Sequence, residues 1–76
     1  MVHLVVQCRS EPRRGEIPVR FGWPGRMREV DEVLDCWEGE EHRDFRLRAA
    51  DGSIYILRHD LRDACWHIHF FRLRPE

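Results

Sequence analysis

The stretch "FRLRAADGSIYIL", residues 45–57, decides the fold because its pattern is that of a β-hairpin. Apolar and polar side chains alternate on both sides of a short segment that contains Asp51 and Gly52. Alternation with a period of two is typical of a strand with one buried face, and a glycine-containing segment between two such runs indicates a turn. We therefore predict two antiparallel strands here.

Two loops are compatible with this hairpin. A two-residue turn would set Leu47 opposite Ile56, whereas a three-residue loop that ends in a left-handed Gly52 sets Leu47 opposite Tyr55. Only the longer loop collects four large apolar side chains on one face, so we predict that register. The predicted pairs are Phe45 with Leu57 and Leu47 with Tyr55 on one face, and Arg46 with Ile56 and Arg48 with Ile54 on the other.

The rest of the chain has the same character. Turn-forming residues recur at short intervals, with runs rich in Val, Ile, Phe, Trp and Leu between them, which is typical of a small antiparallel all-β domain. We predict a meander or small barrel of five or six strands, in a single domain that spans residues 1–76. The expected strands lie near residues 2–9, 17–23, 26–37, 44–50, 53–58 and 64–73, with a Pro24-Gly25 turn between the second and the third.

The third of these segments has an ambiguous pattern. Val30, Val33, Leu34 and Trp37 fall at the spacing of a helical stripe. However, the segment is short and begins just after a tight turn. We predict a strand that bends or bulges near Asp31, with a helical turn as the alternative.

The last segment, "ACWHIHFFRLR" at residues 64–74, resembles a metal site because Cys65, His67 and His69 are soft ligand types. In an extended strand, Cys65 and His69 lie roughly 13 Å apart, too far to bind one ion. We predict no metal site and no cofactor. Strict alternation instead directs Trp66, Ile68 and Phe70 inward and His67, His69 and Phe71 outward.

The length and composition of the chain limit the classes of function that we expect. A chain of 76 residues with 42% hydrophobic and 36% charged residues is a soluble globular domain. Its small core leaves little room for an active-site cavity, and we find no catalytic motif, so we predict that the protein is not an enzyme. No apolar run is long enough to span a membrane, and the N-terminus does not resemble a secretory leader, so we expect a cytoplasmic protein. Three cysteines cannot all pair within the chain.

Charge is unevenly distributed along the chain. All thirteen basic residues are arginine, and the net charge is −1, so net charge does not attract nucleic acid. Residues 29–44 carry eight acids against Arg43. This acidic segment lacks the spacing of a calcium loop, so we interpret it as a solvated edge or a surface for a basic partner. We predict that Asp35 pairs with Arg26 or Arg28 across the second hairpin.

The stretches "PVRFGWPGRMREVDEVLDCW" and "FRLRAADGSIYILRHDLRDACWHI" resemble a family of small uncharacterised bacterial proteins with the pattern F-x-W-x-G-R, V-x-x-V-L-D-x-W and Y-x-L. The resemblance covers residues 18 to 70. It implies a small SH3-like barrel and, through the gene neighbourhood of relatives, a link to translesion synthesis. This sequence departs from the family pattern at Met27, where the pattern has an aromatic residue. The matching residues are Phe21, Trp23, Gly25, Arg26, Val30, Val33, Leu34, Asp35, Trp37, Tyr55, Leu57, Asp60 and Trp66.

The candidate binding site is the outward face of the last three strands. Arginines interleaved with apolar and imidazole side chains suit either a protein partner or nucleic acid. Our leading hypothesis is a non-catalytic protein-interaction module, with self-association through Ile54, Ile56 and Phe71 as one form of it. The alternative is a nucleic-acid-binding accessory domain for DNA repair, with Arg46, Arg48, Arg58, Arg72 and Arg74 on phosphates and Phe71 stacking on bases. The full candidate face is Arg46, Arg48, Ile54, Ile56, Arg58, His67, His69 and Phe71.

Overall fold

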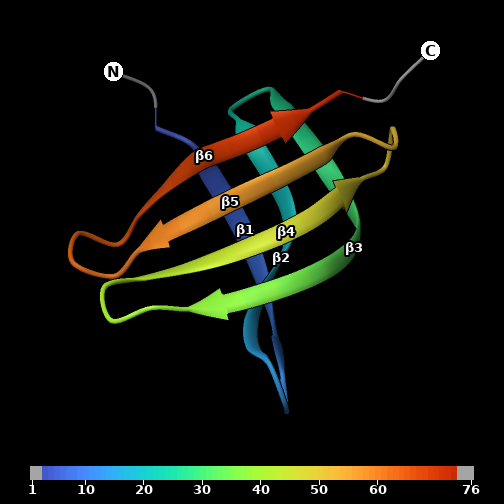
Figure 1. Cartoon of the computed structure of the whole chain (residues 1–76). Coiled ribbons are helices and arrows are strands. Elements are labelled where there is room, and N and C mark those ends of the chain that lie inside the picture. Colours follow the sequence, from blue (N-terminus) through green and yellow to red (C-terminus); the bar gives the residue numbers. More distant parts are fainter. Residues whose placement is uncertain (1–2, 74–76) are drawn as a thin grey trace.

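The computed structural model describes residues 3–73, which form six antiparallel strands and no helix (Figure 1). Each strand pairs with its neighbours in sequence, so the sheet is a meander in the order β1 to β6. All six predicted strands are confirmed, although residue 2 of the first prediction lies outside the described residues. The strands are β1 (Val5–Glu11), β2 (Gly15–Trp23), β3 (Arg26–Glu38), β4 (His42–Ala49), β5 (Ile54–Asp60) and β6 (Cys65–Arg72).

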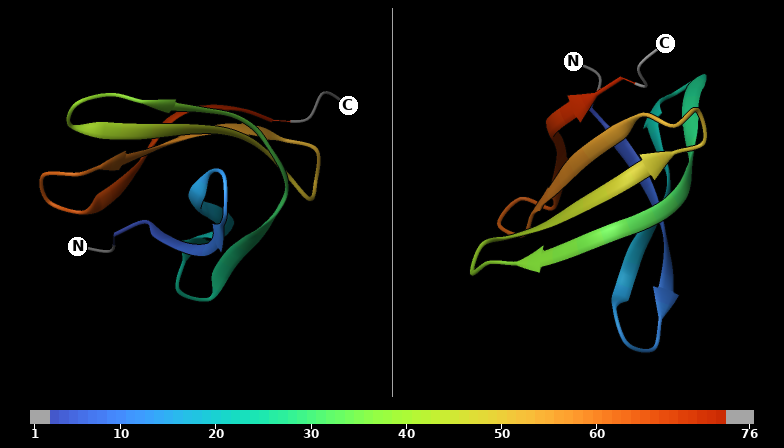
Figure 2. Two further views of the ribbon diagram at one scale, coloured as in Figure 1. Left: turned by 90° about the horizontal axis from the view of Figure 1, so that it is seen from below. Right: turned by 45° about the vertical axis from the view of Figure 1, so that its right-hand side comes forward.

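The all-β fold class is confirmed, but the sheet does not close into a barrel. Over the described residues, β1 pairs only with β2, and β6 pairs only with β5. The pairing of β2 with β3 ends at Arg20 and Glu29, so the β1–β2 hairpin leaves the sheet there. Figure 2 shows the result, in which this hairpin forms a second layer against β4, β5 and β6 and the long β3 bends to join both layers.

The β4–β5 hairpin has the predicted register. Leu47 lies opposite Tyr55, and Arg46 lies opposite Ile56. Gly52 has a φ of +90°, the left-handed conformation that the three-residue loop requires. The Asp51 carboxylate accepts the backbone N–H of Ser53 at 2.9 Å and fixes the same loop.

The third segment is a strand with two bulges, not a helical turn. One extra residue of β3, Asp31, lies between the pairs that Val30 and Glu32 form with β4, as the prediction of a bulge near Asp31 requires. A second extra residue follows Val33. Each bulge converts the normal spacing of two into a spacing of three, so Val30, Val33 and Cys36 all face the core side of β4. The helix-like pattern therefore arises from bulges in a strand.

The core lies between the two layers. Phe21 from the β2 layer contacts Tyr55 from β5 edge to face, with ring centroids 4.8 Å apart. Phe45, Leu47 and Leu57 are fully buried. The core cluster comprises Phe21, Leu47, Ala49, Tyr55 and Leu57, and the partly buried Leu4, Val6, Val30, Val33, Trp66 and Ile68 pack against it.

The alternation predicted for the last strand is correct at its start and wrong at its end. Trp66 and Ile68 face the core, and His67 faces outward opposite Arg58, as predicted. His69 is then an extra residue in a β-bulge, because Ile68 pairs with Leu57 and Phe70 with Ile56. The bulge reverses the phase of the strand. Phe70 therefore lies on the outer face, and Phe71 lies on the inner face opposite Tyr55, stacked on it at 6.2 Å.

Candidate functional site

The residues predicted for the candidate outer face lie on one face of the sheet, with two differences in β6. Phe70 takes the place predicted for Phe71, opposite Ile56. His69 occupies the bulge rather than a regular outward position. The remaining predicted residues lie on one face by their cross-strand pairing, namely Arg46, Arg48, Ile54, Ile56, Arg58 and His67.

Two arginines of this face are engaged by the acidic residues of β3. Arg48 donates from Nε to Asp31 at 2.9 Å and from Nη2 to Glu32 at 2.9 Å. Arg46 forms an ion pair with Asp35. The hydrogen bonds that Arg48 donates to Asp31 and Glu32 raise the pKa of its guanidinium. The acidic segment thus neutralises the basic row beside it.

Arg58, also on this face, pairs with a carboxylate that is less exposed than the partners of Arg46 and Arg48. Arg58 donates two hydrogen bonds to the Asp44 carboxylate, at 2.9 and 3.0 Å, in the bidentate geometry that favours such pairs. Asp44 is only 14% exposed. These hydrogen bonds hold the pKa of Asp44 below its ordinary value, although its partial burial opposes the shift.

The predicted partner of Asp35 is wrong. Asp35 pairs with Arg46 of β4, because the bulges of β3 turn it to the outer face. Arg28 pairs instead with Asp51 at 3.1 Å. Arg26 forms no ion pair with any described residue.

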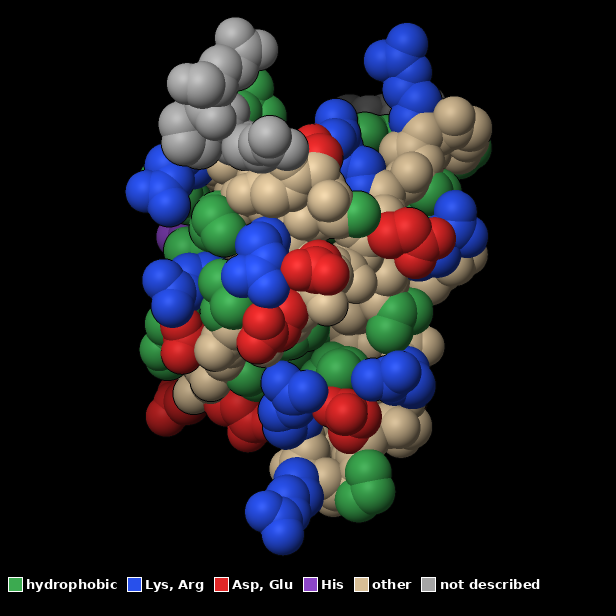
Figure 3. All heavy atoms as spheres, turned by 90° about the vertical axis from the view of Figure 1, so that its right-hand side faces the viewer, with side chains coloured by type: hydrophobic (Ala, Val, Ile, Leu, Met, Phe, Trp, Pro, Cys, Tyr) green, Lys and Arg blue, Asp and Glu red, His purple; other side chains and the backbone are tan. Residues whose placement is uncertain are grey.

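Neutralisation extends over most of the described chain. Nine of its twelve arginines form ion pairs with carboxylates. On the side shown in Figure 3, arginine side chains are interspersed with acidic ones rather than gathered into a basic patch. The three described arginines without such a pair are Arg13, Arg26 and Arg72, and Arg74 lies outside the described residues.

Apolar side chains are left uncovered on the outer face. Ile54 and Ile56 are half-buried there, and Phe70 is 49% exposed. Trp37 is also 49% exposed and lies opposite Asp44 on the same face. Because neighbouring strand residues face opposite sides, one residue of the Phe70-Phe71 doublet lies on the outer face in either register, and the sequence does not show which one.

The family-pattern residues divide between core and surface. Phe21, Tyr55 and Leu57 are buried, and Trp66 is half-buried, with its ring stacked on His59 at 4.3 Å. Val30, Val33, Leu34 and Asp35 are half-buried in β3, Gly25 lies in the β2–β3 turn, and Arg26, Trp23 and Trp37 are exposed.

The ligand-type residues of the last strand do not converge. Within residues 3–73, no group of three His, Cys, Asp or Glu side chains is placed to hold a metal ion. The three cysteines are free. Burial and the nearby Asp63 raise the pKa of the Cys65 thiol, which favours its protonated form.

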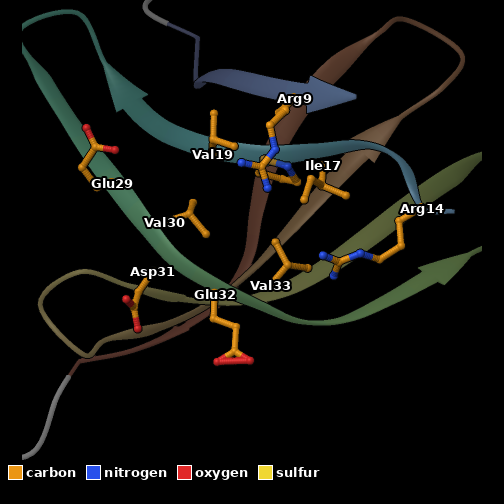
Figure 4. A pocket seen from close by; sticks show the side chains of 10 residues that line it. Arg9, Arg14, Ile17, Val19, Glu29, Val30, Asp31, Glu32 and Val33 are labelled. Atoms are coloured by element: carbon orange, nitrogen blue, oxygen red, sulfur yellow. The ribbon is translucent and has the colours of Figure 1, made fainter. Parts of the chain in front are cut away.

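A cleft of about 450 Å³ opens where β2 separates from β3 (Figure 4). Its charged side chains already have partners. Arg9 and Arg14 pair with Glu11, and Asp31 and Glu32 pair with Arg48. The cleft therefore presents no unpaired cluster for a charged ligand.

None of the described residues forms a helix long and apolar enough to cross a membrane. Comparison of the chain with protein-family models, with curated proteins and with solved structures found no significant match. The family resemblance and its SH3-like barrel stay predictions. What the structure defines is an open six-stranded β-meander in which Arg46, Arg48 and Arg58 of the outer face are paired with carboxylates.

Proposed function

We propose that this protein is a cytoplasmic, non-catalytic protein-interaction module that self-associates through its outer face. The observation that carries the proposal is the pairing of Arg46, Arg48 and Arg58 with carboxylates of β3 and β4. Paired arginines have little charge left for phosphates, and each guanidinium would have to leave a carboxylate to bind one.

The apolar residues between these pairs suit a protein partner. Ile54, Ile56 and Phe70 form a patch on the face of β5 and β6, bordered by the paired arginines of this face and by Arg72. Exposed apolar patches framed by polar residues are typical of protein interfaces. Because three of the four described arginines on this face are paired and only Arg72, opposite Ile54, is not, a second copy meets little like-charge repulsion when the same patch packs against itself about a two-fold axis.

Sedimentation at increasing protein concentration tests the proposal. We expect a monomer–dimer equilibrium that hardly responds to salt, because apolar contacts are not screened. Phe70→Asp should weaken dimerisation at least tenfold, since it places a charge in the centre of the patch. Phe71→Ser is the matched control. Phe71 is the next residue in β6 after Phe70, and its side chain lies on the inner face.

Oligothymidylate binding, followed by fluorescence anisotropy, tests the opposing function. Binding by several arginines would weaken with salt at a log–log slope near −0.7 per phosphate. A protein that stays monomeric at every concentration and binds the oligonucleotide with that slope would contradict the proposal.

A further inference from the structure

A small apolar groove lies on the other side of the sheet, between the two layers. It encloses about 240 Å³ and is lined by Phe21, Gly22, Trp23 and Arg28 from β2 and β3, and by Tyr55, Ile68, Phe71 and Leu73 from β5 and the end of β6. Three of the apolar side chains among them are exposed, Trp23 at 41%, Phe71 at 58% and Leu73 at 61%. The volume is below the roughly 300–1,000 Å³ of small-molecule sites, so it suits one or two side chains rather than a cofactor.

The groove lies beside a free sheet edge. Because β6 pairs only with β5 within the described residues, the backbone groups along its other edge have no strand partner. The bulge at His69 directs Phe71 into the groove next to that edge. Natural proteins generally cover or protect such an edge, and an added strand is one way to do so.

No acidic residue lines the groove, and the one arginine that lines it, Arg28, is paired with Asp51. Trp23 and Arg28 also line an adjoining depression with Arg26 and Met27. Arg26 lies directly opposite Trp23 in the β2–β3 pairing, so the two share a face. Arg26 is one of the few described arginines without a carboxylate partner, and a ligand carboxylate would give it one.

We propose that the free edge of β6 accepts an extended peptide segment of a partner protein, which adds as a further strand. The segment places a large apolar side chain in the groove between Trp23 and Phe71, and a neighbouring carboxylate on Arg26. This inference rests on the proposed function, since it names a partner for the same kind of module, but it uses the opposite face of β6.

A peptide fits these features better than a single-stranded nucleic acid does. A nucleic acid needs a row of cations along its backbone, whereas the rim offers Arg26 alone, because Arg28 is already paired with Asp51. A peptide strand satisfies the free backbone groups of β6 and the apolar groove at once.

Selection from a display library of random eight-residue peptides, as long as β6, tests the proposal on the full chain. We expect enrichment of peptides that alternate large apolar residues with others and carry an Asp or Glu. Hydrogen exchange of the unmodified protein with an enriched peptide should then show new protection at backbone amides of β6. Failure to enrich any peptide, enrichment of basic peptides, or protection confined to other strands would overturn the proposal.

Two variants locate the bound segment. Phe71→Ser should weaken binding of the enriched peptide roughly 30-fold, as loss of a central aromatic contact does at interfaces, while Phe70→Ser should leave it unchanged. Arg26→Glu should weaken it roughly fivefold, and a peptide with its carboxylate replaced by an amide should not respond to that substitution. Equal binding by the wild type and Phe71→Ser, or displacement of the peptide by oligothymidylate, would overturn it.

The same variants separate this inference from the proposed function. Phe70→Asp should weaken dimerisation and leave peptide binding unchanged, and Phe71→Ser should weaken peptide binding and leave dimerisation unchanged. If Phe71→Ser abolishes dimerisation instead, the groove holds a second copy and the peptide proposal is wrong. If no dimer forms but the peptide binds at β6, the outer-face proposal fails alone.

Discussion

Arg58 and Asp44 lie opposite each other on β5 and β4 and are joined by two hydrogen bonds at 2.9 and 3.0 Å. The carboxylate of this pair is largely shielded from water, unlike those of the other ion pairs on the outer face. Shielding reduces screening, so this pair contributes more to stability than its exposed neighbours do.

The first prediction concerns pH. Hydrogen bonds lower the pKa of Asp44, of Asp51 through Ser53, and of Asp60, whose pKa falls to about 2 through Arg62. A carboxyl whose folded pKa lies below its unfolded pKa contributes stability above the unfolded value, and that stability is lost as pH falls through the folded value. We therefore expect the free energy of unfolding, measured in urea, to decrease from about pH 4 towards pH 2.

The variant Asp44→Asn measures how much the Arg58–Asp44 pair contributes to this loss of stability at low pH. We expect it to lower the free energy of unfolding at pH 7 by about 1 kcal/mol, and to make the decrease below about pH 4 shallower than in the wild type. Asp35→Asn, in the more exposed pair with Arg46, is the control and should cost about half of that or less. An Asp44→Asn profile parallel to that of the wild type would contradict the assignment.

A second prediction concerns the contact between the layers at Arg43. This β4 side chain donates to the backbone carbonyls of Arg14 at 3.0 Å and Glu16 at 3.4 Å, and its guanidinium carbon lies 4.9 Å from the centre of the Phe45 ring. These hydrogen bonds link β4 to the β1–β2 hairpin, beside the apolar packing of Phe21 against Leu47 and Ala49. Arg43→Met keeps the aliphatic stem and removes these hydrogen bonds.

We expect Arg43→Met to destabilise the protein by about 1–2 kcal/mol and to speed amide exchange in residues 8–18 selectively. Arg46→Met removes an exposed ion pair of the same sheet and should change neither quantity appreciably. Uniform acceleration of exchange in Arg43→Met would mean that Arg43 stabilises the fold as a whole rather than the hairpin.

A third prediction concerns Gly22 of β2, where a side chain would meet the backbone of β3. Its φ is +146°, and a Cβ there would lie 2.2 Å from the backbone oxygen of Arg26. Gly22→Ala therefore needs movement of the backbone, and we expect a loss of about 3 kcal/mol or more in thermal or urea unfolding. Arg20→Ala, in the same strand, is the control and should cost about 1 kcal/mol or less because its ion pair with Glu29 is exposed.

How much the sequence predicts depends on where the alternation stays regular. Between Phe45 and Leu57 no residue is inserted, so turn chemistry and the apolar pattern together fix every cross-strand pair. In β3 the bulges are encoded as a spacing of three, which a helix also produces. The pattern alone could not separate these two structures, although the preceding tight turn favoured the strand.

The candidate site depends on the same irregularity. A single bulge at His69 exchanges Phe70 and Phe71 between the faces, and the sequence contains no local requirement for it. Likewise, the ion pairs of the outer face depend on which β3 carboxylates the bulges turn outward. Residue types on this face were therefore predictable, whereas their charge balance and the groove behind them were not.

The last prediction tests the bulge itself. Deleting His69 removes the extra residue and leaves Ile68 opposite Leu57 and Phe70 opposite Ile56, so the chain should fold with a change in unfolding free energy of about 1 kcal/mol or less. Deleting His67 is the control, because it shifts Trp66 away from His59, on which its ring stacks at 4.3 Å, or turns it outward. We expect that deletion to cost several times more, measured by urea unfolding with tryptophan fluorescence. If the two deletions destabilise the protein equally, β6 does not tolerate the loss of a residue at position 69, and the bulge is a structural requirement of the sheet rather than an insertion within it.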